Sequence, residues 1–191
     1  MKTLIVCVSA ADGNTRKIAE AMADVLEAEV VDPGEVDDDT LAEADLVGVG
    51  SGIYAVDFHH RIRSFVRRLP QVEGTPAFVY WTSGAPEPPV WRYADRLADR
   101  LEAKGFRVLD SFSSRGWRVW LPFRLVPGLD RGRPNEADLE RARRFATELG
   151  DRVRETLDER TDARSVSYTH LRAHETMTGI SYAVFCLKRG G

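Results

Sequence analysis

The sequence is poor in cysteine and histidine, with two cysteines and four histidines among 191 residues. Cys7 and Cys186 lie far apart, so the spacing offers no disulfide framework and no zinc-binding pattern. Apolar runs of membrane-spanning length are missing, and so is a secretory signal pattern. The sequence has a formal net charge of −3, so it lacks the excess of basic residues that is typical of nucleic-acid-binding proteins. We therefore expect a cytoplasmic protein that has no metal site, no transmembrane segment and no nucleic-acid partner.

Two common phosphate-binding motifs are also missing. The chain has no G-x-x-x-x-G-K-[ST] loop, which excludes the usual nucleotide triphosphate cradle. It also has no G-x-G-x-x-G at the start of its first helical segment, which excludes the dinucleotide fingerprint. Glycines alternate from Gly48 to Gly52, but they end a strand-like segment and run into Ile53 and Tyr54.

The last part of the sequence resembles translated sequencing-library adapters. Residues 166–176 match one reading frame of a transposase adapter, and residues 180–188 match the flow-cell adapter that follows an index. We interpret residues 165–191 as an artefact and residues 155–164 as a native tail, so that the natural C-terminus beyond Arg164 is unknown. The alternative is a natural tail with a strand at residues 180–187. Without this segment the charge balance becomes more acidic.

The remaining sequence alternates strand-like and helix-like segments and fits one domain over residues 1–154. Apolar runs predict strands at 3–8, 29–31, 45–51, 77–81 and 106–113. Amphipathic patterns predict helices, the clearest at 58–69, 90–104 and 135–154, with a short one beginning near Asp37. Strict alternation predicts an α/β fold with a doubly wound, five-stranded parallel sheet.

The first strand is followed by a short polar segment, residues 9–15, and then by an amphipathic helix. The segment contains hydroxyl side chains, Gly13 and Asn14. Backbone N–H groups at a helix start carry partial positive charge, and small residues let a phosphate approach them. The segment therefore predicts a phosphate cradle. The alternative is an ordinary turn in which Asp12 or Asn14 caps the helix.

Small polar residues also end the third and fourth strands, at residues 51–55 and 82–85. Ligands of parallel sheets bind beyond the carboxyl ends of the strands. Three such loops at one edge strengthen the prediction of a phosphate-containing cofactor, because an ordinary turn needs only one glycine or aspartate.

At these loops the chain resembles the flavodoxin-like FMN proteins, from Met1 to about Leu149. Residues 9–15 resemble the FMN-phosphate loop, residues 50–54 the loop against the isoalloxazine ring, and residues 82–84 the second ring loop. Residues 132–139 resemble the G-[RH]-P-N-x-x-D-L entry to the last helix of many flavodoxin-domain proteins. The resemblance implies the strand order 2-1-3-4-5 and FMN as the cofactor.

The resemblance also implies roles for particular residues. The side chains of Ser9, Asn14 and Thr15 and the backbone of Ala10, Ala11 and Gly13 would donate to the phosphate. Tyr54 would lie along the ring, unless it is a half-buried core residue. The full set of implied cofactor-binding residues is Ser9, Ala10, Ala11, Gly13, Asn14, Thr15, Ser51, Gly52, Ile53, Tyr54, Ala55, Thr82, Ser83 and Gly84.

The chain departs from the short electron-carrier flavodoxins in two places. Its phosphate loop is one residue longer, and Asp12-Gly13-x-Thr15-Arg16 is closer to flavodoxin-type protoporphyrinogen dehydrogenases that pass electrons to menaquinone. After Tyr54, relatives often carry a glycine that can flip towards flavin N5, whereas this chain has Ala55, Val56 and Asp57. A β-branched valine resists the positive φ of such a flip.

Three other features have two interpretations each, and a fourth, Cys7, has one. Trp81 either contacts flavin or points into the core, and His59 and His60 are either a proton relay or surface residues of a helix. Cys7 is expected to pack within the first strand. Residues 117–127, rich in aromatic residues and arginine, are either a loop over the sheet or a docking surface for a redox partner, a second subunit or a membrane edge.

The sequence thus favours an FMN-dependent electron-transfer protein whose partner is a redox protein or a quinone. The first alternative is an FMN-dependent dehydrogenase that resembles protoporphyrinogen oxidase and uses a quinone acceptor. The second is a non-flavin interaction module on the same fold. A phosphorylated receiver is disfavoured, because the third strand ends in Gly50-Ser51-Gly52 instead of an aspartate. No catalytic residue can be named.

Overall fold

The computed structural model describes residues 1–9, 13–54, 57–83, 93–115 and 134–159. The chain divides into two compact units, Met1–Val153 and Arg154–Gly191, and only residues 154–159 of the second are described. Of the predicted native tail, residues 155–159 are described and residues 160–164 are not. The adapter-like segment 165–191 and the segment 117–127 lie outside the described residues.

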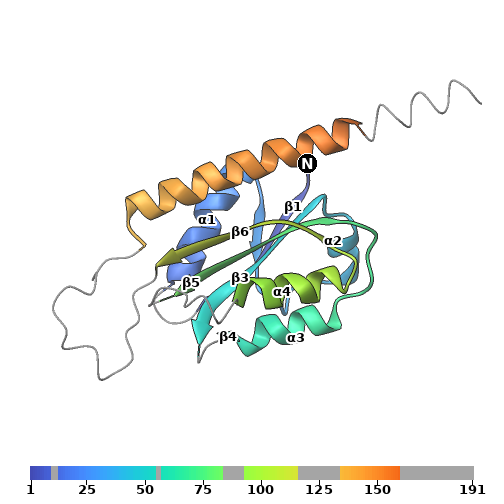
Figure 1. The fold of residues 1–191 in the computed structure, drawn as a ribbon, viewed down its shortest axis with the longest axis horizontal. Coiled ribbons are helices and arrows are strands. Elements are labelled where there is room, and N and C mark those ends of the chain that lie inside the picture. Colours follow the sequence, from blue (N-terminus) through green and yellow to red (C-terminus); the bar gives the residue numbers. More distant parts are fainter. Residues whose placement is uncertain (10–12, 55–56, 84–92, 116–133, 160–191) are drawn as a thin grey trace, which may run out of the picture. The chain divides into compact units, whose positions relative to one another are not determined.

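The sheet has the predicted doubly wound topology, as Figure 1 shows. Its long strands are β1 (Thr3–Val8), β2 (Glu29–Val31), β3 (Leu46–Tyr54), β5 (Pro76–Ser83) and β6 (Arg107–Arg115). They pair in parallel in the order β2-β1-β3-β5-β6, which is the predicted order 2-1-3-4-5 of the five long strands. The prediction missed the two-residue strand β4 (Asp57–Phe58), which pairs antiparallel with the end of β3.

Strands β1 and β5 are buried along almost their whole length, and most of their residues are apolar, because helices cover both faces of the sheet. Every residue of β1 is buried, and so is every residue of β5 except Ser83. This is typical of parallel sheets, whose strands read as continuous hydrophobic runs.

The alternating glycines of β3 make room for the aromatic rings of β5. A Cβ atom at Gly48 would lie 2.4 Å from Cζ of Phe78, and one at Gly50 would lie 2.7 Å from the ring of Tyr80. Both aromatic residues are fully buried. These glycines therefore serve packing and are not part of a dinucleotide loop.

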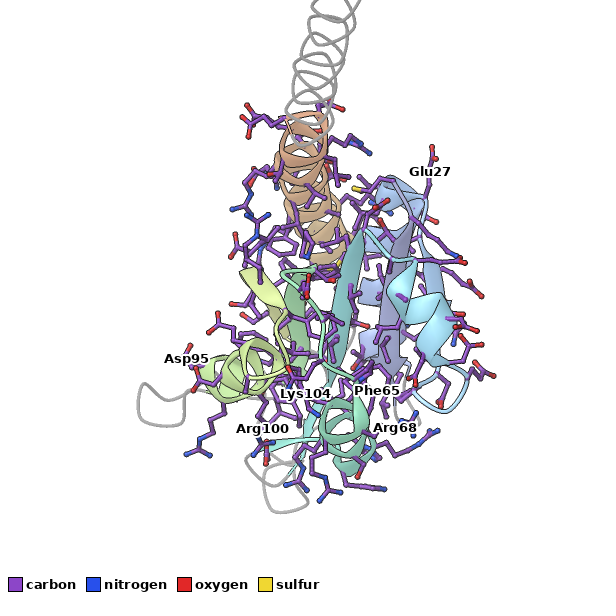
Figure 2. The ribbon with its side chains drawn as sticks, turned by 90° about the vertical axis from the view of Figure 1, so that its right-hand side faces the viewer. Glu27, Phe65, Arg68, Asp95, Arg100 and Lys104 are labelled. Atoms are coloured by element: carbon purple, nitrogen blue, oxygen red, sulfur yellow. The ribbon has the colours of Figure 1, made fainter. Side chains whose placement is uncertain are left out.

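Helices α2 (Asp38–Ala42), α3 (His60–Arg68) and α4 (Tyr93–Glu102) cover one face of the sheet. Figure 2 shows Phe65 on the side of α3 that faces the sheet, and this residue is fully buried. Lys104, which follows α4, donates from Nζ to the Leu69 carbonyl at the end of α3, at 2.7 Å. The predicted helix 58–69 began too early, because Phe58 belongs to β4.

The opposite face is covered by α1 (Asn14–Leu26) and by residues 136–153 of a C-terminal helix that continues to residue 159. The ring of Phe145 contacts Phe78 at 5.9 Å and Phe112 at 5.3 Å between centroids. A reciprocal pair begins the C-terminal helix. The Asn135 N–H donates to Asp138 Oδ2 at 3.2 Å, and the Asp138 N–H donates to Asn135 Oδ1 at 3.0 Å. This reciprocal arrangement is a capping box.

Candidate functional site

The three predicted loops leave the sheet at the same edge. The register pairs Val8 with Ser51 and Gly52 with Thr82, so the carboxyl ends of β1, β3 and β5 lie next to one another. Parallel pairing aligns the ends of neighbouring strands, and the edge beyond them is where ligands of such sheets bind. The prediction that the three loops lie at one edge of the sheet therefore agrees with the strand register.

The first loop begins with Ser9 and leads into α1. Ala10 and Ala11 lie outside the described residues, as does Asp12. The N-cap is Gly13, with φ 67° and ψ 9°, and not Asp12 or Asn14 as the alternative interpretation of the sequence had it. This left-handed conformation favours glycine, and a Cβ atom there would meet nothing within 4 Å. The glycine is therefore required by backbone conformation and not by space.

Ser9 supplies the capping side chain that Gly13 lacks. Its Oγ accepts a hydrogen bond from the Arg16 backbone N–H at 3.3 Å, in the first turn of α1. The first N–H groups of any α-helix have no acceptor within the helix. Because the Ser9 hydroxyl accepts here, its own proton is still available as a donor.

Thr15 connects the first loop to the third. Its side chain is buried under the start of α1, and its Oγ1 lies 2.7 Å from Oγ1 of Thr82 at the end of β5. Both residues were predicted as cofactor contacts, but nothing in the sequence indicated that they contact each other. Ser83, the next residue of the same loop, is half-buried, and Gly84 lies outside the described residues.

The second loop is a small hairpin formed by β3 and β4. Ile53 pairs with Phe58 and Tyr54 with Asp57, whereas residues 55–56, including the predicted Ala55, lie outside the described residues. The side chain of Tyr54 is also not described. The prediction that Tyr54 lies along the ring therefore stays a prediction.

The hydroxyl of Ser51 holds this hairpin together. Ser51 is fully buried, donates to the carbonyl of Gly52 at 2.8 Å and accepts from the backbone N–H of His59 at 3.0 Å. A serine has a single hydroxyl proton, so Ser51 has no proton left for a ligand. Its side chain shapes the loop, and any contact that it makes with a ligand would come from its backbone.

Two histidines stand where this hairpin leads into α3. His59 is the N-cap, and its Nδ1 accepts from the Arg61 N–H at 3.3 Å, while His60 is exposed. Partial burial, followed by the cationic neighbours His60, Arg61 and Arg63, lowers the pKa of His59 below its ordinary value. The neutral ring that results is the form that can accept the capping hydrogen bond.

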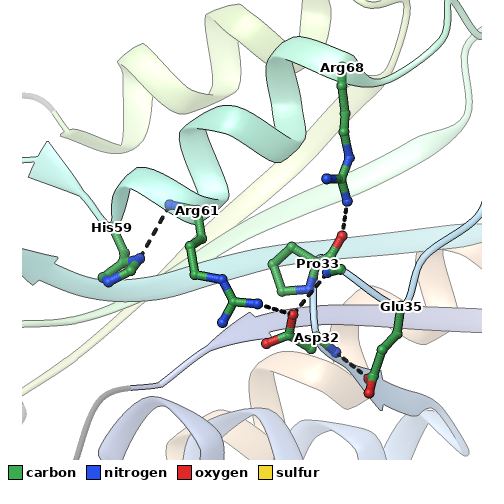
Figure 3. A network of polar contacts seen from close by, with 7 residues as sticks. Asp32, Pro33, Glu35, His59, Arg61 and Arg68 are labelled. Atoms are coloured by element: carbon green, nitrogen blue, oxygen red, sulfur yellow. Dashed lines mark hydrogen bonds and ion pairs between the residues drawn. The ribbon is translucent and has the colours of Figure 1, made fainter.

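Arginines tie α3 to the loop after β2, as Figure 3 shows. Arg61 forms an ion pair with Asp32, and Arg68 donates to the carbonyl of Pro33. Asp32 also accepts from the Gly34 N–H at 2.9 Å. Since β2 ends at Val31, this network holds the helix that follows the second loop against another strand end of the same edge.

Trp81 and Cys7 both pack in the interior of the domain. Trp81 is buried in the core that α3 and α4 cover, and its ring contacts Phe58 edge-on at 6.3 Å between centroids. Cys7 is buried, as expected. Burial raises the pKa of its thiol to about 11, and the neighbouring Tyr80 hydroxyl lowers this pKa to a smaller extent. A thiol with such a raised pKa is mostly protonated at neutral pH and is a poor nucleophile.

The donor chemistry of the described residues fits a phosphorylated cofactor. Ser9 retains a hydroxyl proton, the Thr15–Thr82 pair holds a second one, and the left-handed Gly13 turns the chain into a helix start. Among the described residues, no three His, Cys, Asp or Glu side chains are grouped as metal ligands would be.

Comparisons with known proteins agree with this arrangement. A family model of the flavodoxin domain matches residues 5–115. An uncharacterized protein of Methanocaldococcus jannaschii is 35% identical over 149 residues, which are 78% of this chain and 98% of that protein. The chain belongs to the flavodoxin domain family.

Solved structures share the fold of this flavodoxin domain at low sequence identity. A flavodoxin from the domain Archaea has a TM-score of 0.60 and 20% identity, covering 81% of this chain and 99% of that chain. A flavodoxin from Streptococcus pneumoniae TIGR4 has a TM-score of 0.61 and 20% identity, covering 80% and 99%. The flavodiiron core of Flv1 from Synechocystis sp. PCC6803 has a TM-score of 0.59 and 12% identity, covering 81% of this chain and 36% of that one.

Proposed function

We propose that this flavodoxin domain binds FMN and carries electrons between redox partners. The observation that carries the proposal is the junction of three small polar loops at one sheet edge, two of which are joined by the Thr15–Thr82 hydrogen bond. The flavodoxins among the structural neighbours support the same assignment. When bound, FMN supplies the redox chemistry, and the protein tunes the flavin potential through loop contacts and local charge.

The phosphate would be held by the first loop. Ser9, Asn14 and Thr15 would donate from their side chains, and Ala10, Ala11 and Gly13 from their backbone. Partial positive charge at the start of α1 would attract the dianion. A bound phosphate also accepts several charge-assisted hydrogen bonds, which are stronger than neutral ones.

The ring would lie between the other two loops. Ser51, Gly52, Ile53, Tyr54 and Ala55 would form one side. Ser83 and Gly84, which follow Thr82 in the third loop, would form the other. Because the Ser51 hydroxyl is bonded within the hairpin, its role here is to fix the path of the backbone beside the ring. His59 and Arg61 would hold that hairpin in turn, through the start of α3.

We propose a redox protein or a quinone as the electron acceptor. None of the described helices is both long enough and apolar enough to cross a bilayer. In this proposal a quinone would be met at a peripheral contact. The FMN-loaded chain, chemically reduced beforehand and freed of excess reductant, would be mixed with a water-soluble quinone or with a small redox protein. The rates at which the reduced flavin is reoxidised would distinguish the two acceptors.

Titration of the apoprotein with FMN and with riboflavin, followed by flavin fluorescence, tests the binding proposal. FMN should bind much more tightly than riboflavin. The double variant Asn14→Ala/Thr15→Ala should lose most of that preference, since each charge-assisted donor contributes about 1.5–3 kcal/mol. An apoprotein that leaves FMN fluorescence unchanged would contradict the proposal. Equal losses for both ligands would show that these side chains do not touch phosphate.

A further inference from the structure

We propose that Thr82 is a positioning residue of the phosphate site and not a contact of the flavin ring. In this inference, which rests on the proposed binding of FMN, the Thr82 hydroxyl donates its proton to Thr15 Oγ1. The proton of Thr15 is then directed into the first loop, where the phosphate would accept it.

The face of β5 that carries Thr82 supports this assignment. Side chains alternate along a strand, so Phe78, Tyr80 and Thr82 share one face, and Trp81 and Ser83 share the other. Phe78 contacts Phe145 of the C-terminal helix, and Thr82 contacts Thr15 of α1. Thr82 thus points to the α1 side of the sheet, towards the start of α1.

The geometry of the contact allows either hydroxyl to donate, so we infer the direction of the hydrogen bond from the burial of the two groups and from their partners. Thr15 is 2% exposed and Thr82 is 5% exposed, so neither hydroxyl is freely hydrated. Within the described part of the chain, Thr82 Oγ1 has Thr15 Oγ1 as its one side-chain hydrogen-bond partner. A buried hydroxyl proton without an acceptor is costly, and donation to Thr15 satisfies the proton of Thr82. The remaining proton of the pair then belongs to Thr15, at the start of α1.

The neighbouring strand offers a matched control. Ser114 is the register partner of Thr82 on β6 and is also 5% exposed. Its Oγ has no hydrogen-bond partner among the described residues. Ser114 therefore resembles Thr82 in burial and in place along the strand, but it lacks the contact with Thr15.

The test measures dissociation constants for FMN and for riboflavin with Thr82→Val, which keeps the shape and removes the hydroxyl. The FMN constant should rise about tenfold, as expected for the loss of one oriented donor, while the riboflavin constant changes less than twofold. Thr82→Ser should restore FMN binding, and Ser114→Ala should leave the ratio of the two constants unchanged. Thr82→Ala serves as a second variant if Thr82→Val does not fold.

A double-mutant cycle separates positioning from direct contact. If Thr82 acts through Thr15, adding Thr82→Val to Thr15→Val should change the FMN constant less than twofold. The inference would be overturned if Thr82→Val weakened FMN binding tenfold both in the wild-type background and in the Thr15→Val background. It would also be overturned if Thr82→Val weakened the binding of FMN and of riboflavin to the same extent. Unchanged FMN binding by Thr82→Val would also overturn it and leave the proposed function intact. A wild-type protein that does not prefer FMN to riboflavin would overturn both.

Discussion

At the scale of single residues, the hydroxyl groups of this domain serve different purposes although they look alike in the sequence. Ser51 uses its only proton inside the hairpin, Ser9 accepts from the first turn of α1, and Thr15 and Thr82 bond to each other. Composition alone marks all four as potential ligand contacts. Only the positions of their partners show which of them retain a proton for a ligand.

Gly48 gives a prediction that depends on packing alone. Gly48→Ala should destabilise the fold by about 1–3 kcal/mol, because the added Cβ would lie 2.4 Å from the ring of Phe78. Denaturant unfolding measures the loss. In a Phe78→Leu background the cost of Gly48→Ala should be clearly smaller, since the clashing ring is gone. The same cost in both backgrounds would show that the ring is not what Gly48 accommodates.

At the scale of elements, the helices of this domain begin in chemically different ways. Asp37 caps α2 by accepting from the Thr40 N–H at 2.7 Å, and Asn135 caps the C-terminal helix, in line with the usual cap preferences. The N-caps of α1 and α3, Gly13 and His59, could not be predicted from these cap preferences. Gly13 has no side chain, so the capping acceptor at the start of α1 is the hydroxyl of Ser9, four residues earlier. His59 can accept the capping hydrogen bond only when its ring is neutral.

The capping pair of the C-terminal helix can be tested directly. Asn135→Ala should lower the free energy of unfolding by about 1 kcal/mol, because the Asp138 N–H loses its acceptor. Asn135→Asp retains an acceptor at the same place and should cost clearly less. Thermal or denaturant unfolding distinguishes the two variants. Equal losses would indicate that the side-chain hydrogen bond is not what stabilises this helix start.

The boundaries of elements were less predictable than their order. Strand β3 extends to Tyr54 and β6 to Arg115, beyond the predicted ends at residues 51 and 113. Phe58 was assigned to a helix because its spacing to Ile62 and Phe65 fits a helical face. Pairing with Ile53 places it in β4 instead, which is a contact that local periodicity does not reveal.

At the scale of the whole molecule, topology was the most predictable property. Alternation of apolar strands and amphipathic helices predicted a doubly wound parallel sheet, and the resemblance to flavodoxin-like proteins implied the order of its five long strands. The loops at the carboxyl ends of neighbouring strands were therefore expected to meet. The contacts across that edge were not predictable. The Thr15–Thr82 bond joins residues 67 positions apart in the sequence, and their pairing depends on where α1 crosses β5.

Global stability should fall in alkaline solution, in part because of Cys7. Burial raises the pKa of this thiol from 9.0 to about 11, so between these values the unfolded chain loses the proton while the folded chain keeps it. The contribution of Cys7 is thus fully present below pH 9 and is lost as the pH rises to about 11. The loss amounts to roughly 2–3 kcal/mol.

Unfolding midpoints measured from pH 8 to pH 11 test this expectation. Cys7→Ala should have a lower midpoint at pH 8, because it leaves a small cavity. It should also lose less stability per pH unit above pH 9 than the wild type. Burial also raises the pKa of Tyr80, so part of the decline above pH 10 should persist in the variant. Identical slopes would show that Cys7 does not titrate as expected.

The short length of β2 bears on aggregation through the edge of the sheet. It is an outermost strand of the sheet and spans only three residues. An exposed strand edge invites another chain to add its own strand and start an aggregate, and proteins limit this hazard by keeping such edges short. Beyond Val31, the chain turns away into the loop held by Arg61 and Arg68. This margin of the sheet therefore gives an incoming strand too few backbone groups to extend the sheet from one molecule into the next.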